Sequence, residues 1–243
     1  MKILAKVSYL GTNYHGWQIQ PNGLTIQEVV EKTISKILNT PTKIFGSGRT
    51  DAGVHATGQT FHFETDKEDL DLARFKYSLN SLLPDDISIN SLEVVREDFH
   101  ARYSAKRKHY QYRIYTGKKN PFVYQTSLYY PYDLNVNLFV EALGYFGGKH
   151  NFQNFTSKEE DEDNYVRNIY QTNTKFDDDM IIVDIIGDGF MRYMIRDIIG
   201  TCLAVASKKE DLTYISDRLD NPNSSHTAYR ASPEGLFLID VIY

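Results

Sequence analysis

The sequence predicts an α+β fold built from two similar halves, with mixed, mainly antiparallel sheets flanked by helices. Three observations support this prediction: short stretches alternate apolar and polar residues as strands do, longer stretches repeat apolar residues at helical spacing, and this succession occurs twice. The 243 residues, of which 41% are hydrophobic and 24% charged, are enough for two domains of ordinary size. We expect an N-terminal domain at residues 1–105 and a C-terminal domain at residues 106–243.

The first half is expected to follow the order β-α-β-β-α-β. Its strands are predicted at residues 2–9, 42–45, from about 54 onward and 87–95, and its helices at residues 26–38 and 69–83. Thr25 and Glu28 have capping-box spacing at the start of the first helix. Pro84 ends the second helix. This order gives an antiparallel sheet with helices on one face.

The second half is expected to begin with a strand at residues 108–115, after a junction around residues 102–107. In that strand His109, Gln111 and Arg113 share one face and the tyrosines share the other. The remaining elements are strands at residues 127–132, 167–176, 180–186 and 236–242, and helices at residues 136–146, 190–207 and 211–219. Residues 156–164 are too acidic to pack and are expected to form a mobile loop.

The charge distribution favours a nucleic-acid partner more than the net charge of -5 does. Between Arg96 and Lys119 the chain carries eight basic residues and two acidic ones. Contacts with phosphates require such a local basic patch, whatever the net charge is. The 18 tyrosines could also offer flat faces for base stacking. On charge alone, a solvated basic strand face is an equally good interpretation.

The chain is expected to act in the cytoplasm and not in a membrane. Residues 1–6 are too short an apolar stretch for a signal sequence, and no run approaches the ~18 apolar residues of a membrane span. Cys202 is the only cysteine, which excludes an intrachain disulfide and a cysteine-based zinc site. Because Cys202 lies in an apolar run, we expect it to be buried.

Residues 46–56 form a loop rich in small side chains, and this loop is the strongest candidate site. It holds three glycines and two alanines around Arg49 and Asp51. An ion pair would keep the carboxylate ionised, which suits a nucleophilic or electrostatic role. The alternative is that Asp51 only caps a turn, as aspartates between small residues commonly do.

A second candidate is the stretch 106–113, in which cationic and aromatic residues alternate. This pattern suits phosphate contact combined with base stacking. It also fits an amphipathic strand whose tyrosines lie in the core.

A third candidate is the pair Arg192 and Arg196, spaced four residues apart near the start of the predicted helix 190–207. Two cations at a helix N-terminus oppose its dipole and require an anion. The candidate anions are Asp51, an RNA phosphate, Asp188 and Asp197.

Other common motifs do not fit. Residues 46–50 lack the Lys-Ser/Thr ending of a phosphate-binding loop. His55 and His62 have no third ligand at a suitable spacing, and their odd separation places them on opposite faces of a strand, so no metal site is expected. No serine-nucleophile motif is present.

Several motifs follow one another in a fixed order over nearly the whole chain. They are Tyr9-x-Gly11-x-x-Tyr14-x-Gly16-Trp17-Gln18, Gly48-Arg49-Thr50-Asp51-Ala52-Gly53-Val54-His55-Ala56 with Gly58-Gln59, Phe99-His100-Ala101-Arg102 with Arg107 and Tyr110-x-Tyr112, Phe152 and Phe155, Val166-Arg167, Phe190-x-x-x-Met194-x-Arg196-x-x-x-Gly200, and Pro233-Glu234-Gly235-Leu236. In this combination the sequence resembles the bacterial tRNA pseudouridine synthase A family.

The resemblance implies an isomerase that breaks the C1'-N1 bond of uridine, rotates the base and rejoins it through C5. It implies that the uridines lie at positions 38, 39 and 40 in the anticodon stem-loop of tRNA, and that no metal or cofactor takes part. Asp51 would be the essential catalytic carboxylate. Whether it attacks the ribose, attacks the base or abstracts a sugar proton stays open.

The resemblance also implies roles for four substrate-binding residues. Arg49 would help to displace the target base from its stack, as chemistry on a base inside a helix requires. Tyr110 would lie against the uracil and could take part in proton abstraction from C5. Arg196 would pair with Asp51, and Leu236 would form an apolar wall of the pocket.

The implied architecture is two α+β halves with the active-site cleft between them, working as a homodimer that binds the anticodon stem-loop across both subunits. Phosphate contacts would come from the basic residues Arg102, Lys106, Arg107 and Lys108. The resemblance leaves open the role of the acidic residues 159–163 and the choice of uridines and tRNAs. Two other functions stay possible from the residues: a catalytically silent RNA-binding module, and a carboxylate-dependent hydrolase of a small nucleotide.

Overall fold

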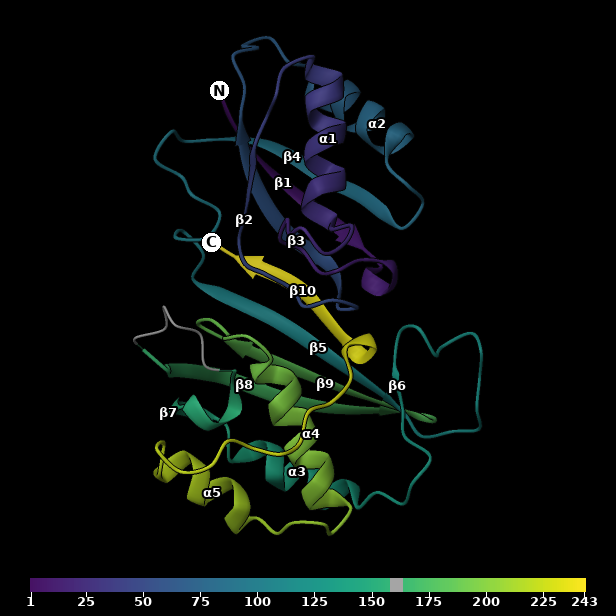
Figure 1. Ribbon diagram of the computed structural model, residues 1–243, viewed down its shortest axis with the longest axis vertical. Coiled ribbons are helices and arrows are strands. Elements are labelled where there is room, and N and C mark those ends of the chain that lie inside the picture. Colours follow the sequence, from purple (N-terminus) through teal and green to yellow (C-terminus); the bar gives the residue numbers. More distant parts are fainter. Residues whose placement is uncertain (158–163) are drawn as a thin grey trace. The chain divides into compact units, whose positions relative to one another are not determined.

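The computed structural model describes residues 1–157 and 164–243, and it confirms an α+β fold with mainly antiparallel strand pairing (Figure 1). The chain forms two compact units: Met1–Lys106 together with Phe237–Tyr243, and Arg107–Leu236. The domain bounds expected above, 1–105 and 106–243, stay a prediction. The acidic stretch 159–163 lies outside the described residues.

The first unit contains a sheet in the order β4-β1-β3-β10, with β2 paired to β3. The strands are β1 (Lys2–Tyr9), β2 (Ile44–Gly46), β3 (His55–Glu64), β4 (Ile87–Val95) and β10 (Leu236–Ile242). Strand β3 pairs antiparallel with β1 and parallel with β10, where Phe237 lies opposite His55. Eight of the ten residues of β3 are buried.

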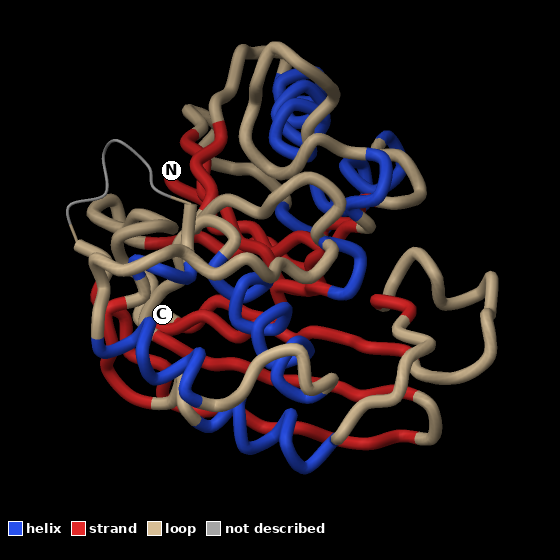
Figure 2. Tube along the Cα trace, turned by 60° about the horizontal axis from the view of Figure 1, so that its bottom comes forward, coloured by secondary structure: helices blue, strands red, loops and turns tan. Residues whose placement is uncertain are grey.

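Two helices, α1 (Ile26–Leu38) and α2 (Leu72–Leu82), cover one side of this sheet (Figures 1 and 2). The predicted cap of α1 is confirmed, because the Thr25 side chain accepts a hydrogen bond from the Glu28 backbone N–H at 3.4 Å. Asp71 caps α2 in the same way through Arg74 N at 3.0 Å, so α2 begins at Leu72 and not at residue 69.

The second unit contains a sheet in the order β5-β9-β8-β7, with the short β6 parallel to β5. The strands are β5 (Arg107–Tyr115), β6 (Leu128–Tyr129), β7 (Gly148–Asn151), β8 (Val166–Asp177) and β9 (Met180–Gly187). The alternation predicted for β5 is confirmed: Tyr110, Tyr112 and Ile114 are buried, whereas His109 and Gln111 both bind Asp184 on the other face. Strand β7 was not predicted.

Three helices complete the second unit: α3 (Val136–Gly144), α4 (Met194–Ala206) and α5 (Thr213–Asp220). Helix α4 packs against α3, and twelve of its thirteen residues are buried, Cys202 among them. It begins four residues later than predicted, because Tyr193 adopts a left-handed conformation with φ of 64° that interrupts a helix. Among the described residues no helix has the length and apolar character needed to cross a membrane.

Candidate active site

Asp51 lies in the loop between β2 and β3 of the first unit. Its side chain is half-buried, and that of Arg49 is exposed. Directly after Asp51 the chain turns: Val54 N donates to Asp51 O at 3.1 Å, and Gly53 takes a φ of 79° that favours glycine. Asp51 therefore stands at a tight turn, as its small neighbours predicted, and the residue as a whole is only partly exposed to solvent.

The start of this loop is fixed by side chains of the adjoining strand. Ser47 Oγ donates to Gln59 Oε1 at 2.7 Å, and Gln59 Nε2 donates to Gly48 O at 3.0 Å. Ser47 N also donates to Thr60 O at 2.8 Å. Gln59 is fully buried, so these bonds are shielded from competition with water.

A second segment, residues 9–17, braces the loop at Thr50. Trp17 N donates to Thr50 O at 3.1 Å, and the Tyr9 hydroxyl bonds Thr50 Oγ1 at 2.8 Å. Burial raises the pKa of Tyr9, so this phenol keeps its proton. Just past Asp51, Gly53 N donates to Tyr14 O at 3.4 Å. The residues on both sides of Asp51 are thus held by the 9–17 segment.

Gly16 permits the closest approach between these two segments. Its φ is +82°, and a Cβ placed on it would lie 2.5 Å from Thr50 O and 3.1 Å from Ala52 N. Only glycine fits this position without moving the backbone that carries Asp51. The motif at residues 9–18 therefore has a structural task, to hold the backbone on both sides of Asp51, which its sequence alone did not reveal.

His55 supports the same region from the first residue of β3. It is fully buried, its Nδ1 accepts a hydrogen bond from Gly11 N at 3.0 Å, and its ring packs 4.6 Å from that of Phe237. An Nδ1 that accepts from a backbone amide is not offering that lone pair to a metal. Among the described residues no group of three or more histidine, cysteine, aspartate or glutamate side chains is arranged to hold a metal.

In the second unit Tyr110 and Tyr112 project from the same face of β5. Tyr110 is 7% exposed and packs edge-on against Phe190, with ring centroids 5.3 Å apart. The hydroxyl of Tyr112 donates to Ser232 O at 2.6 Å. Burial raises the pKa of Tyr112, so it stays a hydrogen-bond donor. This bond ties β5 to the segment that leads into Leu236.

Arg196 lies in the first turn of α4 and is tied to that same segment. Arg196 Nε donates to Ala231 O at 2.8 Å, and Ala231 N donates to Arg196 O at 2.9 Å. The charge of Arg196 also acts on Tyr112, whose pKa it lowers against the larger effect of burial. Leu236 follows after a 3-10 turn (Pro233–Gly235) and is 5% exposed. The second unit therefore brings Tyr112, Arg196 and the approach to Leu236 into one arrangement.

The arrangement predicted for Arg192 and Arg196 is wrong in one respect. Arg192 precedes α4, so the two side chains do not share a helical face. Both guanidinium groups instead lie near the ring of Tyr193, at 4.8 Å and 5.2 Å from its centroid. Of the local anions considered for them, Asp197 instead accepts two hydrogen bonds from Arg230, a residue that the sequence motifs did not single out.

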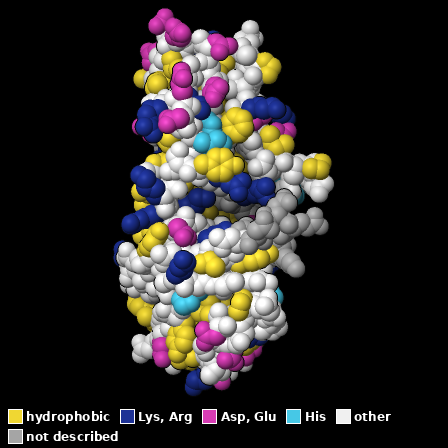
Figure 3. Space-filling view, turned by 90° about the vertical axis from the view of Figure 1, so that its left-hand side faces the viewer, with side chains coloured by type: hydrophobic (Ala, Val, Ile, Leu, Met, Phe, Trp, Pro, Cys, Tyr) yellow, Lys and Arg dark blue, Asp and Glu magenta, His cyan; other side chains and the backbone are white. Residues whose placement is uncertain are grey.

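The basic residues predicted to bind RNA lie in the sequence on both sides of the junction between Lys106 and Arg107. Arg102 and Lys106 belong to the first unit and are exposed; Arg107, in the second, is also exposed, and Lys108 is half-buried. Arg107 lies 4.8 Å above the ring of Tyr170, whose surface is 47% exposed. One face of the molecule carries several Lys and Arg side chains interspersed with apolar ones (Figure 3).

Comparison with known proteins identifies the family. A family model described as tRNA pseudouridine synthase matches residues 5–104 and 142–243. The chain is 40% identical to tRNA pseudouridine synthase A of Ruminiclostridium cellulolyticum over 100% of its own length and 99% of that protein's. It is 40% identical to the protein of the same name from Caldicellulosiruptor saccharolyticus, covering 99% of each chain. A relative from Bacillus cereus, tRNA pseudouridine synthase A 1, is 39% identical over 100% of this chain and 98% of its own.

Among solved structures, a Cbf5-Nop10-Gar1 complex aligns with 83% of this chain and 44% of the matched chain, at 14% identity and a TM-score of 0.37. That score is too low to support an argument about this protein. The family is shown by the sequence relatives and by the family model. The chain belongs to the tRNA pseudouridine synthase family, and it is an isomerase that acts on uridine in tRNA.

Proposed function

We propose that the protein isomerises uridine to pseudouridine at positions 38, 39 and 40 of the tRNA anticodon stem-loop, with Asp51 as the catalytic carboxylate. The observation that carries this proposal is the bracing of the Asp51 loop. Thr50 is held through its carbonyl and its hydroxyl, and Gly53 is held through its amide. A loop that merely turned the chain would not need this support, whereas a group that must meet a reacting atom does.

The reaction exchanges one glycosidic bond for another within the same nucleotide. The C1'-N1 bond breaks, the base rotates, and a C1'-C5 bond forms; the proton displaced from C5 is balanced by the proton that N1 gains. Asp51 would act on the ribose or on the base as a carboxylate. The target nucleotide must leave its stack to reach it. The exposed Arg49, two residues before Asp51, is suited to taking the place of that base.

Three residues of the second unit are proposed to complete the pocket. Arg196 would pair with Asp51 and hold it ionised, Tyr110 would lie against the uracil, and Leu236 would form an apolar wall. Their support is local: Arg196 is oriented by a hydrogen bond of 2.8 Å to a backbone carbonyl, and the rings of Tyr110 and Phe190 pack together. Fixed side chains of this kind are what a pocket for a flat base requires.

The tRNA backbone is proposed to bind the basic residues Arg102, Lys106, Arg107 and Lys108. Three of the four are exposed, and the Arg107–Tyr170 pair offers a cation beside a ring. We further propose that the protein works as a homodimer in the cytoplasm, where its tRNA substrate would be modified.

The proposal is tested with unmodified tRNA transcripts that carry uridine, or cytidine as the matched control, at positions 38, 39 and 40. Pseudouridine is expected at these positions in the uridine transcripts, with none elsewhere in the anticodon arm. Binding of tRNA without any pseudouridine would favour the silent RNA-binding module. Release of free uracil or phosphate would favour a hydrolase, because an isomerase releases neither.

A further inference from the structure

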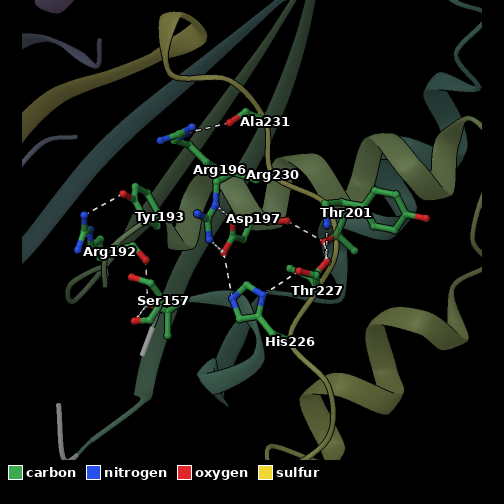
Figure 4. A network of polar contacts seen from close by, with 12 residues as sticks. Ser157, Arg192, Tyr193, Arg196, Asp197, Thr201, His226, Thr227, Arg230 and Ala231 are labelled. Atoms are coloured by element: carbon green, nitrogen blue, oxygen red, sulfur yellow. Dashed lines mark hydrogen bonds and ion pairs between the residues drawn. The ribbon is translucent and has the colours of Figure 1, made fainter. Parts of the chain in front are cut away.

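Asp197 and Arg230 form an ion pair whose carboxylate is fully buried (Figure 4). Arg230 Nε donates to Asp197 Oδ1 at 2.5 Å, and its Nη2 donates to Oδ2 at 3.0 Å. The side chain of Asp197 is 0% exposed and that of Arg230 is 36% exposed. A bidentate pair of this kind fixes direction as well as distance. His226 Nε2 lies 3.4 Å from Oδ2 on another side of the same carboxylate.

The pair joins two segments that are 33 residues apart in the sequence. Asp197 is in the first turn of α4, and Arg230 is in the segment that crosses this helix on its way to β10. The crossing is close: a Cβ on Gly200 would lie 2.8 Å from the backbone N of both Arg230 and Ala231. The ion pair therefore fixes the crossing segment at the residue directly before Ala231.

Ala231 is the residue that orients Arg196. Its carbonyl accepts from Arg196 Nε at 2.8 Å, and its amide donates to Arg196 O at 2.9 Å. A shift of the crossing segment would move this carbonyl and turn the guanidinium of Arg196. The ion pair thus acts on the orientation of Arg196 first through the backbone of Ala231, the residue next to Arg230.

Arg230 also acts on the orientation of Arg196 through the ring of Tyr193, which both guanidinium groups contact. The guanidinium of Arg230 lies 3.9 Å from the ring centroid, and that of Arg196 lies 5.2 Å from it. The hydroxyl of the same ring accepts from Arg192 Nη2 at 2.9 Å. Figure 4 shows the side chains of Arg192, Arg196 and Arg230 around Tyr193. Arg230 therefore holds both the carbonyl and the ring that define the direction of Arg196.

We propose that Asp197 and Arg230 are positioning residues for Arg196. The inference rests on the proposed role of Arg196 in the substrate pocket. Neither residue needs to touch the tRNA. The buried ion pair fixes the position of the crossing segment, and that segment fixes the orientation of the Arg196 guanidinium. Since misplacing a reacting or orienting group by ~1 Å costs on the order of 100-fold in rate, loss of the pair should act on kcat more than on KM.

The test compares Arg230→Ala, Arg230→Lys and native protein in steady-state pseudouridine formation on tRNA. We expect Arg230→Ala to lower kcat by about 10- to 100-fold with KM changed less than about threefold. Arg230→Lys keeps a charged donor group but loses the bidentate geometry, so its kcat should lie between those of Arg230→Ala and the native protein. Guanidinium ion at low millimolar concentration should restore part of the Arg230→Ala activity, and sodium chloride at the same concentration should not.

Thr227→Val is the matched control for a purely structural effect. It removes the hydrogen bonds that Thr227 Oγ1 forms with Thr201 Oγ1 at 2.8 Å and with Tyr229 N at 3.3 Å. It therefore loosens the crossing segment before Arg230, while both Arg230–Asp197 bonds remain to hold Arg230 and Ala231 in place. It should lower the melting temperature and leave kcat near the native value.

Three results would overturn the inference. They are a native kcat in Arg230→Ala, a loss of activity in Thr227→Val as large as in Arg230→Ala, or a failure of guanidinium to restore any activity. Absence of pseudouridine with the native protein would instead overturn the proposed function, so the two failures are distinguishable.

Discussion

Replacing Gly16 by alanine should separate the placement of Asp51 from the stability of the fold. Alanine at a φ of +82° costs about 1–2 kcal/mol in backbone energy. Its Cβ would also lie 2.5 Å from Thr50 O, whereas ordinary contact begins at 3.4 Å, so the loop has to move by about 0.9 Å. The neighbouring atoms are backbone, which cannot rotate away as a flexible side chain can.

A displacement of about 0.9 Å at the residue before Asp51 should lower the single-turnover rate constant on the order of 100-fold. The free energy of unfolding should fall by about 2–4 kcal/mol, which corresponds to a drop in Tm of about 5–10 °C. Pseudouridine formation under single-turnover conditions, measured well below the Tm of the variant, gives the rate. Thermal denaturation gives the stability.

Gly148→Ala provides the matched control. Gly148 has a φ of +94°, but the atom nearest to a Cβ placed on it would be His150 Nε2, at 3.7 Å. Alanine at this position therefore adds backbone strain without a clash. This variant should lose about 1–2 kcal/mol of stability and keep its rate. If Gly16→Ala kept the native rate, or if Gly148→Ala lost as much rate as Gly16→Ala, the reasoning that links bracing to catalysis would be refuted.

Three further changes test other parts of the structure. Gln59→Leu removes the two side-chain bonds from Gln59 to Ser47 Oγ and Gly48 O at the start of the Asp51 loop, so it should cost about 1–3 kcal/mol in thermal denaturation and lower kcat as well. Tyr112→Phe removes the bond to Ser232 O and should cost about 1 kcal/mol while lowering kcat severalfold; an unchanged kcat would show that this bond does not order the pocket. Burial and then the neighbouring His100 lower the pKa of His62 to about 4, so the unfolded chain binds its proton first as the pH falls. Stability should therefore decline by about 1–2 kcal/mol between pH 6.5 and 4, and His62→Gln should remove that part of the decline in denaturation curves measured at each pH.

Local patterns predicted most of the secondary structure correctly. The capping box at Thr25 marked the start of α1, and the bounds of β4 and β10 agree with the expected residues 87–95 and 236–242. These elements are set by short-range chemistry: a hydroxyl that caps a backbone amide, and apolar residues at a regular period. The first residue of α4 was predicted wrongly, because Tyr193 takes a left-handed conformation, and its ring packs against Arg230, which comes from a segment 37 residues further along the chain.

Short or irregular strands were the least predictable elements. β7 contains Gly148, Lys149, His150 and Asn151, with no alternation of apolar and polar residues, and only its pairing with β8 makes it a strand. The expected strand at residues 127–132 shrinks to Leu128–Tyr129, paired with β5. Pairing between strands is a tertiary interaction, and a single sequence carries little information about it.

At the candidate site, the residues that carry chemical groups could be predicted from the sequence, whereas the contacts that hold them in place could not. Asp51 and Arg196 stood out through their motifs. Gly16 and Gln59 belong to the quoted motifs, but their task could not be predicted, because it depends on a close approach of two backbones and on buried hydrogen bonds. Arg230 had no signal of its own, because its partner Asp197 lies 33 residues away.

The central claim is that a braced Asp51 carries the isomerisation, and one measurement tests it most directly. Native protein, Asp51→Asn and Asp69→Asn, an exposed aspartate of the first unit, are each mixed in excess with tRNA, and pseudouridine is followed in a single turnover. We expect Asp51→Asn to lose at least ~1000-fold in rate while its tRNA affinity and Tm stay close to native, and Asp69→Asn to behave as native. Pseudouridine formed by Asp51→Asn at a rate near the native one would contradict the account.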